Sequence, residues 1–125
     1  MAKKILIVED NPDLMYVLRK QVENLGFQTL LAVNGKQAVE LAAAQLPDLI
    51  LMDMMMPQMN GMEATRLIRQ NPKTQAVPIL AVTVLQTHED REKCLQSGCN
   101  DYLNKPFTFE QLGSRIEKLL LQQPA

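Results

Sequence analysis

Charged and polar side chains stand where the apolar runs of this chain end, and their types suit chemistry on phosphorus. Glu9 and Asp10 follow the first apolar run, and Asp53 closes a central one. Thr83 and Lys105 follow two later runs. If these runs are parallel strands, their carboxyl ends meet at one rim of the sheet, where α/β proteins bind ligands. The sequence therefore predicts that three carboxylates, a hydroxyl and an ammonium lie together.

Three carboxylates held close together repel one another unless a cation joins them. Their oxygens suit a hard divalent ion, and Mg²⁺ binds through a few carboxylates and waters. A carboxylate beside Mg²⁺ can attack phosphorus and become an aspartyl phosphate, and Asp53 is the candidate for this role. Lys105 could neutralise the new phosphoryl oxygens, and Thr83 could donate a hydrogen bond to them. Each residue alone has a trivial explanation, but their joint occurrence at strand ends favours a site.

The apolar runs alternate with amphipathic segments along the chain. A short apolar run between chain breakers indicates a strand buried on both faces. We expect strands at 3–8, 27–33, 49–53, 78–83 and 99–104. Apolar residues at helical spacing predict helices at 12–25, 36–45, 61–70, 89–96 and 109–121. Asn34-Gly35 could form a hairpin turn, but the helical pattern that follows argues against one.

Five successive strand–helix units predict an α/β fold with a parallel sheet and helices on both faces. The 125 residues and the hydrophobic content of 46% suit a globular domain with a real core. The sequence contains no linker, repeat or low-complexity segment. We therefore expect one domain over 1–125.

The composition argues against nucleic-acid and membrane surfaces. Thirteen basic and fourteen acidic residues give a net charge of -1, and aromatic residues make up 4% with no Trp. No apolar run approaches the ~20 residues of a membrane span, and the first run is too short for a signal peptide. We expect a cytoplasmic protein that inserts into no membrane and binds no nucleic acid directly.

The cysteines and the histidine offer no alternative site. Cys94 and Cys99 form no C-x-x-C pair, and His88 is the single histidine, so the sequence does not favour zinc. In a reducing cytoplasm both cysteines are expected to be packed thiols. His88 is expected to be a solvated surface residue.

Four segments give the chain a resemblance to a known family. They are Ile-Leu-Ile-Val-Glu-Asp-Asn at 5–11, Asp-Leu-Ile-Leu-Met-Asp-Met-Met-Met-Pro at 48–57 with Asn60-Gly61, Pro-Ile-Leu-Ala-Val-Thr at 78–83, and Gly-Cys-Asn-Asp-Tyr-Leu-Asn-Lys-Pro-Phe at 98–107. Over essentially its whole length the chain resembles the receiver domain of bacterial two-component response regulators, in particular the single-domain regulators of chemotaxis. The resemblance implies a flavodoxin-like (βα)5 fold with strand order 2-1-3-4-5.

The resemblance also implies roles for the acidic residues. Asp53 would accept a phosphoryl group from a histidine kinase or a histidine phosphotransfer protein. Asp10 and Asp53 would bind Mg²⁺ directly, together with the carbonyl of Met55, and Glu9 would act through water. Such a protein is a signalling switch that catalyses only its own phosphorylation and dephosphorylation.

The same resemblance implies a switch. Thr83 and Tyr102 would be the switch pair and Lys105 the phosphate sensor, and the Lys105–Pro106 peptide bond would be cis. Val84 follows Thr83 where the family usually has a smaller alanine.

The implied output is a change of affinity for a downstream protein at the face formed by the fourth helix, the fifth strand and the fifth helix. We expect a monomer. Asp101 and Arg115 could pair across a weak symmetric dimer, but exposed ion pairs contribute only ~0–1 kcal/mol.

Three alternatives remain open. A receiver cut from a hybrid kinase or a larger regulator would have the same sequence features, although the complete last helix favours a free-standing protein. An aspartate-based phosphohydrolase resembling the haloacid dehalogenases would carry a second aspartate where this chain has Met55. A passive flavodoxin-like binding module is disfavoured because no phosphate-binding loop follows the first strand.

Overall fold

Five parallel strands form one sheet in the order β2-β1-β3-β4-β5 in the computed structural model, which describes residues 3–54, 59–84 and 88–121. The strands are β1 (Lys4–Val8), β2 (Gln28–Ala32), β3 (Leu49–Asp53), β4 (Ile79–Thr83) and β5 (Asp101–Asn104). The helices are α1 (Pro12–Asn24), α2 (Gly35–Gln45), α3 (Gly61–Gln70), α4 (His88–Gln96) and α5 (Phe109–Leu121). The expected flavodoxin-like fold and strand order are confirmed.

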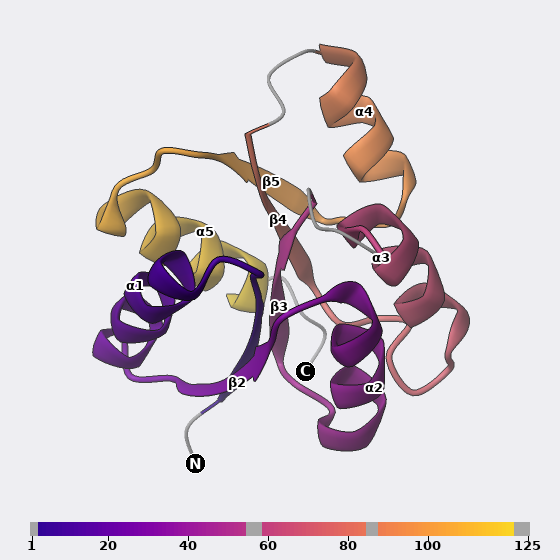
Figure 1. The fold of residues 1–125 in the computed structure, drawn as a ribbon, viewed down its shortest axis with the longest axis horizontal. Coiled ribbons are helices and arrows are strands. Elements are labelled where there is room, and N and C mark those ends of the chain that lie inside the picture. The colour runs from indigo at the N-terminus through magenta and orange to yellow at the C-terminus, as the bar shows by residue number, and fades with distance from the viewer. Residues whose placement is uncertain (1–2, 55–58, 85–87, 122–125) are drawn as a thin grey trace.

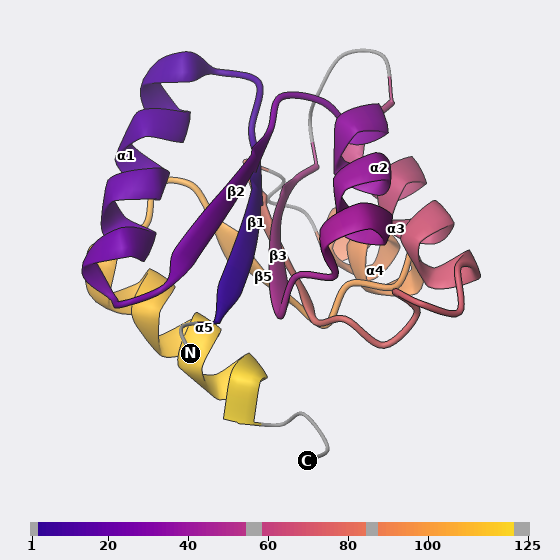
Figure 2. The same ribbon diagram turned by 90° about the horizontal axis from the view of Figure 1, so that it is seen from below.

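The helices form two layers around the sheet. Figure 1 and, from below, Figure 2 show α1 and α5 on one face and α2, α3 and α4 on the other. Along β1, Ile5 and Ile7 pack toward α1 and α5, while Leu6 and Val8 pack toward α2 and α3. This alternation follows from the two-residue period of a strand. No described helix is long and apolar enough to cross a membrane.

The central strands are buried on both faces, which explains their uninterrupted apolar runs. Every residue of β3 and β4 is buried, including the polar Asp53 and Thr83 that end them. Parallel strands covered by helices on both sides require such runs. The buried backbone therefore carries these two polar side chains to the carboxyl edge of the sheet.

Asparagine caps start three helices. The side chain of Asn11 accepts hydrogen bonds from the backbone N–H groups of Asp13 and Leu14, at 2.9 and 3.2 Å. Asn34 and Asn60 cap α2 and α3 in the same way. Each cap satisfies N–H groups that have no partner inside the helix. The expectation that Asn34-Gly35 starts a helix rather than a hairpin is confirmed.

Strand β5 begins two residues later than the sequence suggests, because the end of α4 uses those residues. The N–H of Gly98 bonds to the carbonyl of Leu95, and the N–H of Cys99 bonds to that of Cys94. Together with the positive φ of 117° at Gly98, these bonds close a Schellman turn. Cys94 and Cys99 are buried thiols, as expected, and burial raises the pKa of Cys99 to about 11.

Arg69, at the end of α3, anchors the turn before β5. Its guanidinium donates hydrogen bonds to the carbonyls of Gly98 and Val77, at 3.0 and 2.6 Å, and to the side chain of Asn100 at 2.8 Å. Asn100 in turn accepts a hydrogen bond from the N–H of Ile79 at 2.8 Å. These contacts fix the starts of β4 and β5 relative to each other, and thereby the far ends that carry Thr83 and Lys105.

The start of α3 at Gly61 lies very close to the backbone at the end of β3. A Cβ at this position would overlap the carbonyl oxygen of Asp53 and lie 2.8 Å from the Cα of Met54. We expect Gly61→Ala to lower the free energy of unfolding by about 1–3 kcal/mol, the usual cost of overpacking. Urea unfolding followed by circular dichroism measures this change.

Gly113 in α5 provides the matched control. A Cβ there meets only the flexible side chain of Leu25, at 3.2 Å. Because alanine also favours a helix interior, Gly113→Ala should leave stability nearly unchanged or raise it. Equal losses in both variants would contradict the close approach at Gly61.

Candidate functional site

Three carboxylates from two strands converge at the carboxyl edge of the sheet. Glu9 and Asp10 follow β1, and Asp53 ends the neighbouring β3. One oxygen from each lies within 4.8 Å of the others. Glu9 and Asp53 are buried, whereas Asp10 is exposed. We call these three residues the carboxylate cluster, and the structure confirms that they lie together as the sequence predicts.

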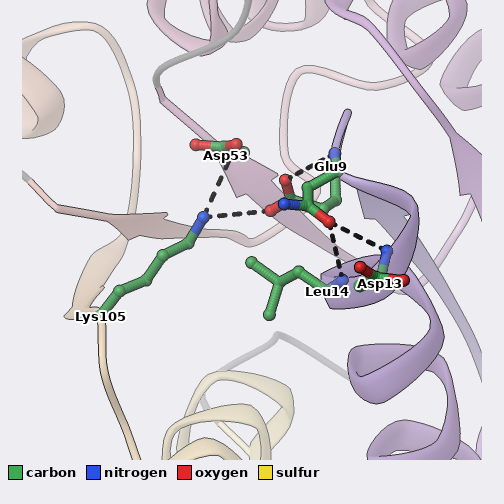
Figure 3. Close-up of polar contacts among 6 residues, drawn as sticks. Glu9, Asp13, Leu14, Asp53 and Lys105 are labelled. Atoms are coloured by element: carbon green, nitrogen blue, oxygen red, sulfur yellow. Dashed lines mark hydrogen bonds and ion pairs between the residues drawn. The ribbon is translucent and has the colours of Figure 1, made fainter.

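Lys105 reaches the carboxylate cluster from the end of β5. Its Nζ lies 3.1 Å from Oε1 of Glu9 and 3.7 Å from Oδ2 of Asp53. Figure 3 shows the lysine side chain extending toward both carboxylates. The backbone N–H of Lys105 donates a hydrogen bond to the backbone carbonyl of Thr83 at 2.8 Å, which joins the ends of β4 and β5. The Lys105–Pro106 peptide bond is cis, as expected.

Glu9 is held on both of its oxygens. One oxygen faces Lys105, and the other accepts a hydrogen bond from the N–H of Asn11 at 3.1 Å. The side chain of Asn11 caps α1, so the same residue fixes Glu9 and starts the helix. The part played by Asn11 toward Glu9 was not foreseen, because a backbone N–H contact has no side-chain signal in the sequence.

The charges at the site are unbalanced. Three carboxylates lie together, and the ammonium of Lys105 lies beside two of them, Glu9 and Asp53. Burial raises the pKa of Glu9 above its ordinary value of 4.5, and the negative charge of Asp53 adds to the effect. The hydrogen bonds from Asn11 and Lys105 act in the opposite direction. An all-oxygen donor set with excess negative charge fits a hard divalent cation such as Mg²⁺.

Not every predicted metal ligand can be placed. The carbonyl of Met55, expected to complete the Mg²⁺ site, lies outside the described residues.

The two proposed switch residues lie on the adjacent strands β4 and β5, where Tyr102 stands opposite Ala81, two residues before Thr83. Thr83 is buried at the end of β4 and stands opposite Asn104 in the sheet register. Tyr102 is half-buried, and the guanidinium of Arg91 from α4 lies 5.4 Å from the centre of its ring. Such a cation–π contact links α4 to β5. The sequence did not point to Arg91, because the contact depends on how α4 is placed.

Arg115 fastens α5 to β5 beside Tyr102. Its Nη1 lies 3.2 Å from Oδ1 of Asp101 and donates a hydrogen bond to the carbonyl of Tyr102 at 2.7 Å. Asp101 and Arg115 thus pair within this chain, and their pairing across a weak symmetric dimer stays a prediction. His88 is exposed, as expected, and lies 2.9 Å from Glu92.

Comparison with known proteins agrees with this geometry. Residues 5–117 match the family model described as the response regulator receiver domain. The chain is 35% identical over 120 residues to the polar-differentiation response regulator DivK of Brucella anthropi, covering 96% of this chain and 98% of DivK. It is 40% identical over 117 residues to Protein PilH of Pseudomonas aeruginosa, covering 94% of this chain and 97% of PilH.

A solved structure shows the same architecture with a metal ion. It is the receiver domain of a sensor histidine kinase from Pseudomonas aeruginosa, with a magnesium ion coordinated in its active-site cleft. Its TM-score against this chain is 0.92 at 40% sequence identity, and the match covers 98% of this chain and 100% of that domain.

The pKa of Glu9 tests the electrostatics of the site. Because the folded-state pKa of Glu9 is raised above 4.5, the folded protein holds this proton more firmly than the unfolded chain does. The stability contributed by Glu9 is therefore present below pH 4.5 and is lost as the pH rises through the folded-state pKa. Asp53→Asn removes the negative charge that helps to raise the pKa of Glu9, so this pKa should fall in that variant.

Carboxyl ¹³C chemical shifts followed against pH without Mg²⁺ measure the pKa of Glu9 directly. Glu117→Gln, which removes an exposed charge from α5, is the control and should leave the Glu9 titration unchanged. A Glu9 pKa that does not move in Asp53→Asn would contradict the repulsion described above.

Proposed function

The chain belongs to the response regulator receiver family and is a phosphoacceptor signalling switch, and we propose that Asp53 is the residue that accepts the phosphoryl group. The observation that carries this proposal is the position of Asp53 between the other two carboxylates of the cluster and the ammonium of Lys105. Its carboxylate belongs to the carboxylate cluster and also lies 3.7 Å from the ammonium of Lys105. A nucleophile at this point has a cation beside it to receive the transferred group.

The phosphoryl transfer follows from these positions. One oxygen of Asp53 attacks phosphorus while the bond from phosphorus to the histidine nitrogen of the donor breaks, which leaves an aspartyl phosphate. The Lys105 ammonium neutralises the phosphoryl oxygens, and the Thr83 hydroxyl donates a hydrogen bond to one of them. Because Lys105 already contacts Glu9 and Asp53, it needs only a small movement to follow the new charge.

Mg²⁺ is the proposed cofactor. Asp10 and Asp53 would hold it directly with the Met55 carbonyl, and Glu9 would act through water. Its role when bound is to offset the negative charge shared by the carboxylate cluster and the phosphoryl group. The oxygen donor set of this chain supports the assignment, as does the magnesium ion in the related receiver domain of the Pseudomonas aeruginosa sensor kinase.

The proposed phosphodonor is a histidine kinase or a histidine phosphotransfer protein, and the proposed output partner is a downstream protein. We place the protein in the cytoplasm, since its two buried, unbridged cysteines suit a reducing compartment. We further propose that 1–125 acts as one receiver domain and as a monomer, without direct binding to nucleic acid. Beyond its own phosphorylation and dephosphorylation it catalyses no reaction.

A second organisation is supported by one comparison. The receiver domain of a sensor histidine kinase is 40% identical to this chain, as is PilH, whose length the match almost fully covers. The same fold thus occurs within a kinase and in a chain of about this length. An immunoblot of host extract distinguishes them, because a receiver that is part of a kinase migrates with the mass of the larger protein.

The switch is proposed to run through Thr83 and Tyr102. Movement of Thr83 toward the phosphoryl group would leave space into which the Tyr102 ring turns, a two-state packing change. Arg91 lies over that ring, and Arg115 bonds to the carbonyl of Tyr102. A change at Tyr102 would therefore reach α4 and α5 together, on the face proposed to contact the partner.

Labelling by acetyl phosphate and Mg²⁺ tests the phosphoacceptor. We expect Asp53→Asn to abolish incorporation, because the substitution removes the carboxylate oxygen that is proposed to attack phosphorus. Asp13→Asn, an exposed change in the first turn of α1, is the matched control and should incorporate phosphate as the unmodified protein does. Full, base-labile incorporation in Asp53→Asn would reject the assignment.

NMR with beryllofluoride and Mg²⁺ tests the switch. Binding at Asp53 should shift amide signals at the carboxylate cluster and also along α4, β5 and α5. In Tyr102→Ala the distant shifts should shrink while those at the cluster stay. Tyr16→Ala, at an exposed position on α1, is the control and should leave both sets in place. Shifts confined to α1 and α2 would show that the face is wrongly assigned.

A further inference from the structure

A groove is lined by residues of α3 and of the C-terminal part of α4. Figure 1 shows these two helices on the side of the sheet away from α1 and α5. Its volume is about 420 Å³, within the range of small-molecule sites. The residues that line it are Met62, Arg66, Lys93, Gln96 and Ser97. They come from α3, from α4 and from the residue that follows α4, and none of them belongs to the carboxylate cluster.

The groove has an unbalanced positive charge. Arg66 on α3 and Lys93 on α4 both line it, and none of the other lining residues that the structure describes carries a carboxylate. Among the described residues, neither cation takes part in an ion pair. Glu92 on α4 is instead paired with His88, at 2.9 Å. The two cations therefore face one groove without an acidic side chain among its described lining residues.

Weak packing explains why the groove exists. The facing sides of α3 and α4 carry polar and cationic residues where packed helices carry apolar ones. The helices α2 and α3 pack closely along each other, whereas α3 and α4 hardly touch. At the end of α4, Cys94 and Ser97 are buried.

We propose that this groove binds a compact organic phosphate, held between Arg66 and Lys93. The flat guanidinium of Arg66 can donate two parallel hydrogen bonds to phosphate oxygens, and the Lys93 ammonium supplies a second positive charge. The amide of Gln96 offers a further donor, and Met62 gives an apolar surface for the organic part. Two cations match one phosphate group, whereas an extended acidic peptide would need a longer row of them.

The bound anion would join α3 to α4. Since α4 has few other contacts, its position would depend on whether the groove is filled. The helix starts shortly after Thr83 and carries Arg91, which lies over Tyr102. A ligand in the groove would thus influence the same helix as phosphorylation does, from a separate site, and its binding does not require Asp53.

NMR titration with pyrophosphate at constant ionic strength, without Mg²⁺, tests the proposal. Amide shifts should saturate and should centre on 62–66 and 93–97. The double variant Arg66→Gln with Lys93→Gln should weaken binding by about tenfold or more, because it removes both charged donors. Arg66→Lys keeps the charge but loses the two-point contact. Its affinity for pyrophosphate should therefore lie between that of the unmodified protein and that of the double variant.

Lys36→Gln with Lys118→Gln is the matched control, since it removes two exposed cations from α2 and α5 and changes the net charge equally. It should bind pyrophosphate as the unmodified protein does. An equal loss in the control, shifts centred on the carboxylate cluster and Lys105, or binding of hexaglutamate without binding of pyrophosphate would each overturn the proposal. All of the substituted side chains are exposed, so the amide spectra should confirm that each variant is folded.

Discussion

The mutual repulsion of Glu9, Asp10 and Asp53 is the constraint on which the site depends. Their oxygens lie within 4.8 Å of one another, and two of the three residues are buried. Ionised groups at such distances inside a protein disfavour one another strongly. Burial is the main cause of the raised pKa of Glu9, and the negative charge of Asp53 adds to it. The ammonium of Lys105 offsets part of the repulsion. The negative charge that remains favours a divalent cation. Because the three carboxylates repel one another, contacts outside the site must hold them in place.

Contacts outside the site hold the carboxylates and Lys105 in position. The buried strands β1 and β3 bring their ends together, and Asn11 holds Glu9 while it caps α1. Arg69 and Asn100 fix the start of β5, so that its far end delivers Lys105 to the carboxylates. Removing the charge repulsion alone would stabilise the fold, whereas loosening these supports would lose the geometry. The site is thus maintained at a local cost that packing elsewhere offsets.

Much of this arrangement could be predicted from the sequence, for a physical reason. Buried parallel strands must be apolar, so a polar residue such as Asp53 at the end of a run stands out, and all such ends share one edge. Contacts between helices and strands could not be predicted in the same way. The cation–π contact of Arg91 and the pairing of Arg115 with Asp101 depend on how α4 and α5 are placed. The late start of β5 likewise depends on the Schellman turn that uses Cys99.

Titration with Mg²⁺, followed by the amide NMR signals of the unphosphorylated protein, tests the central claim most directly. If the carboxylate cluster is an electrostatically unbalanced cation site, a single Mg²⁺ should bind with shifts centred on 8–11, 53 and 105. Asp10→Asn should weaken this binding, because it removes one ligand and one negative charge. Equal affinity in Asp10→Asn, or shifts that centre on another part of the chain, would contradict the claim.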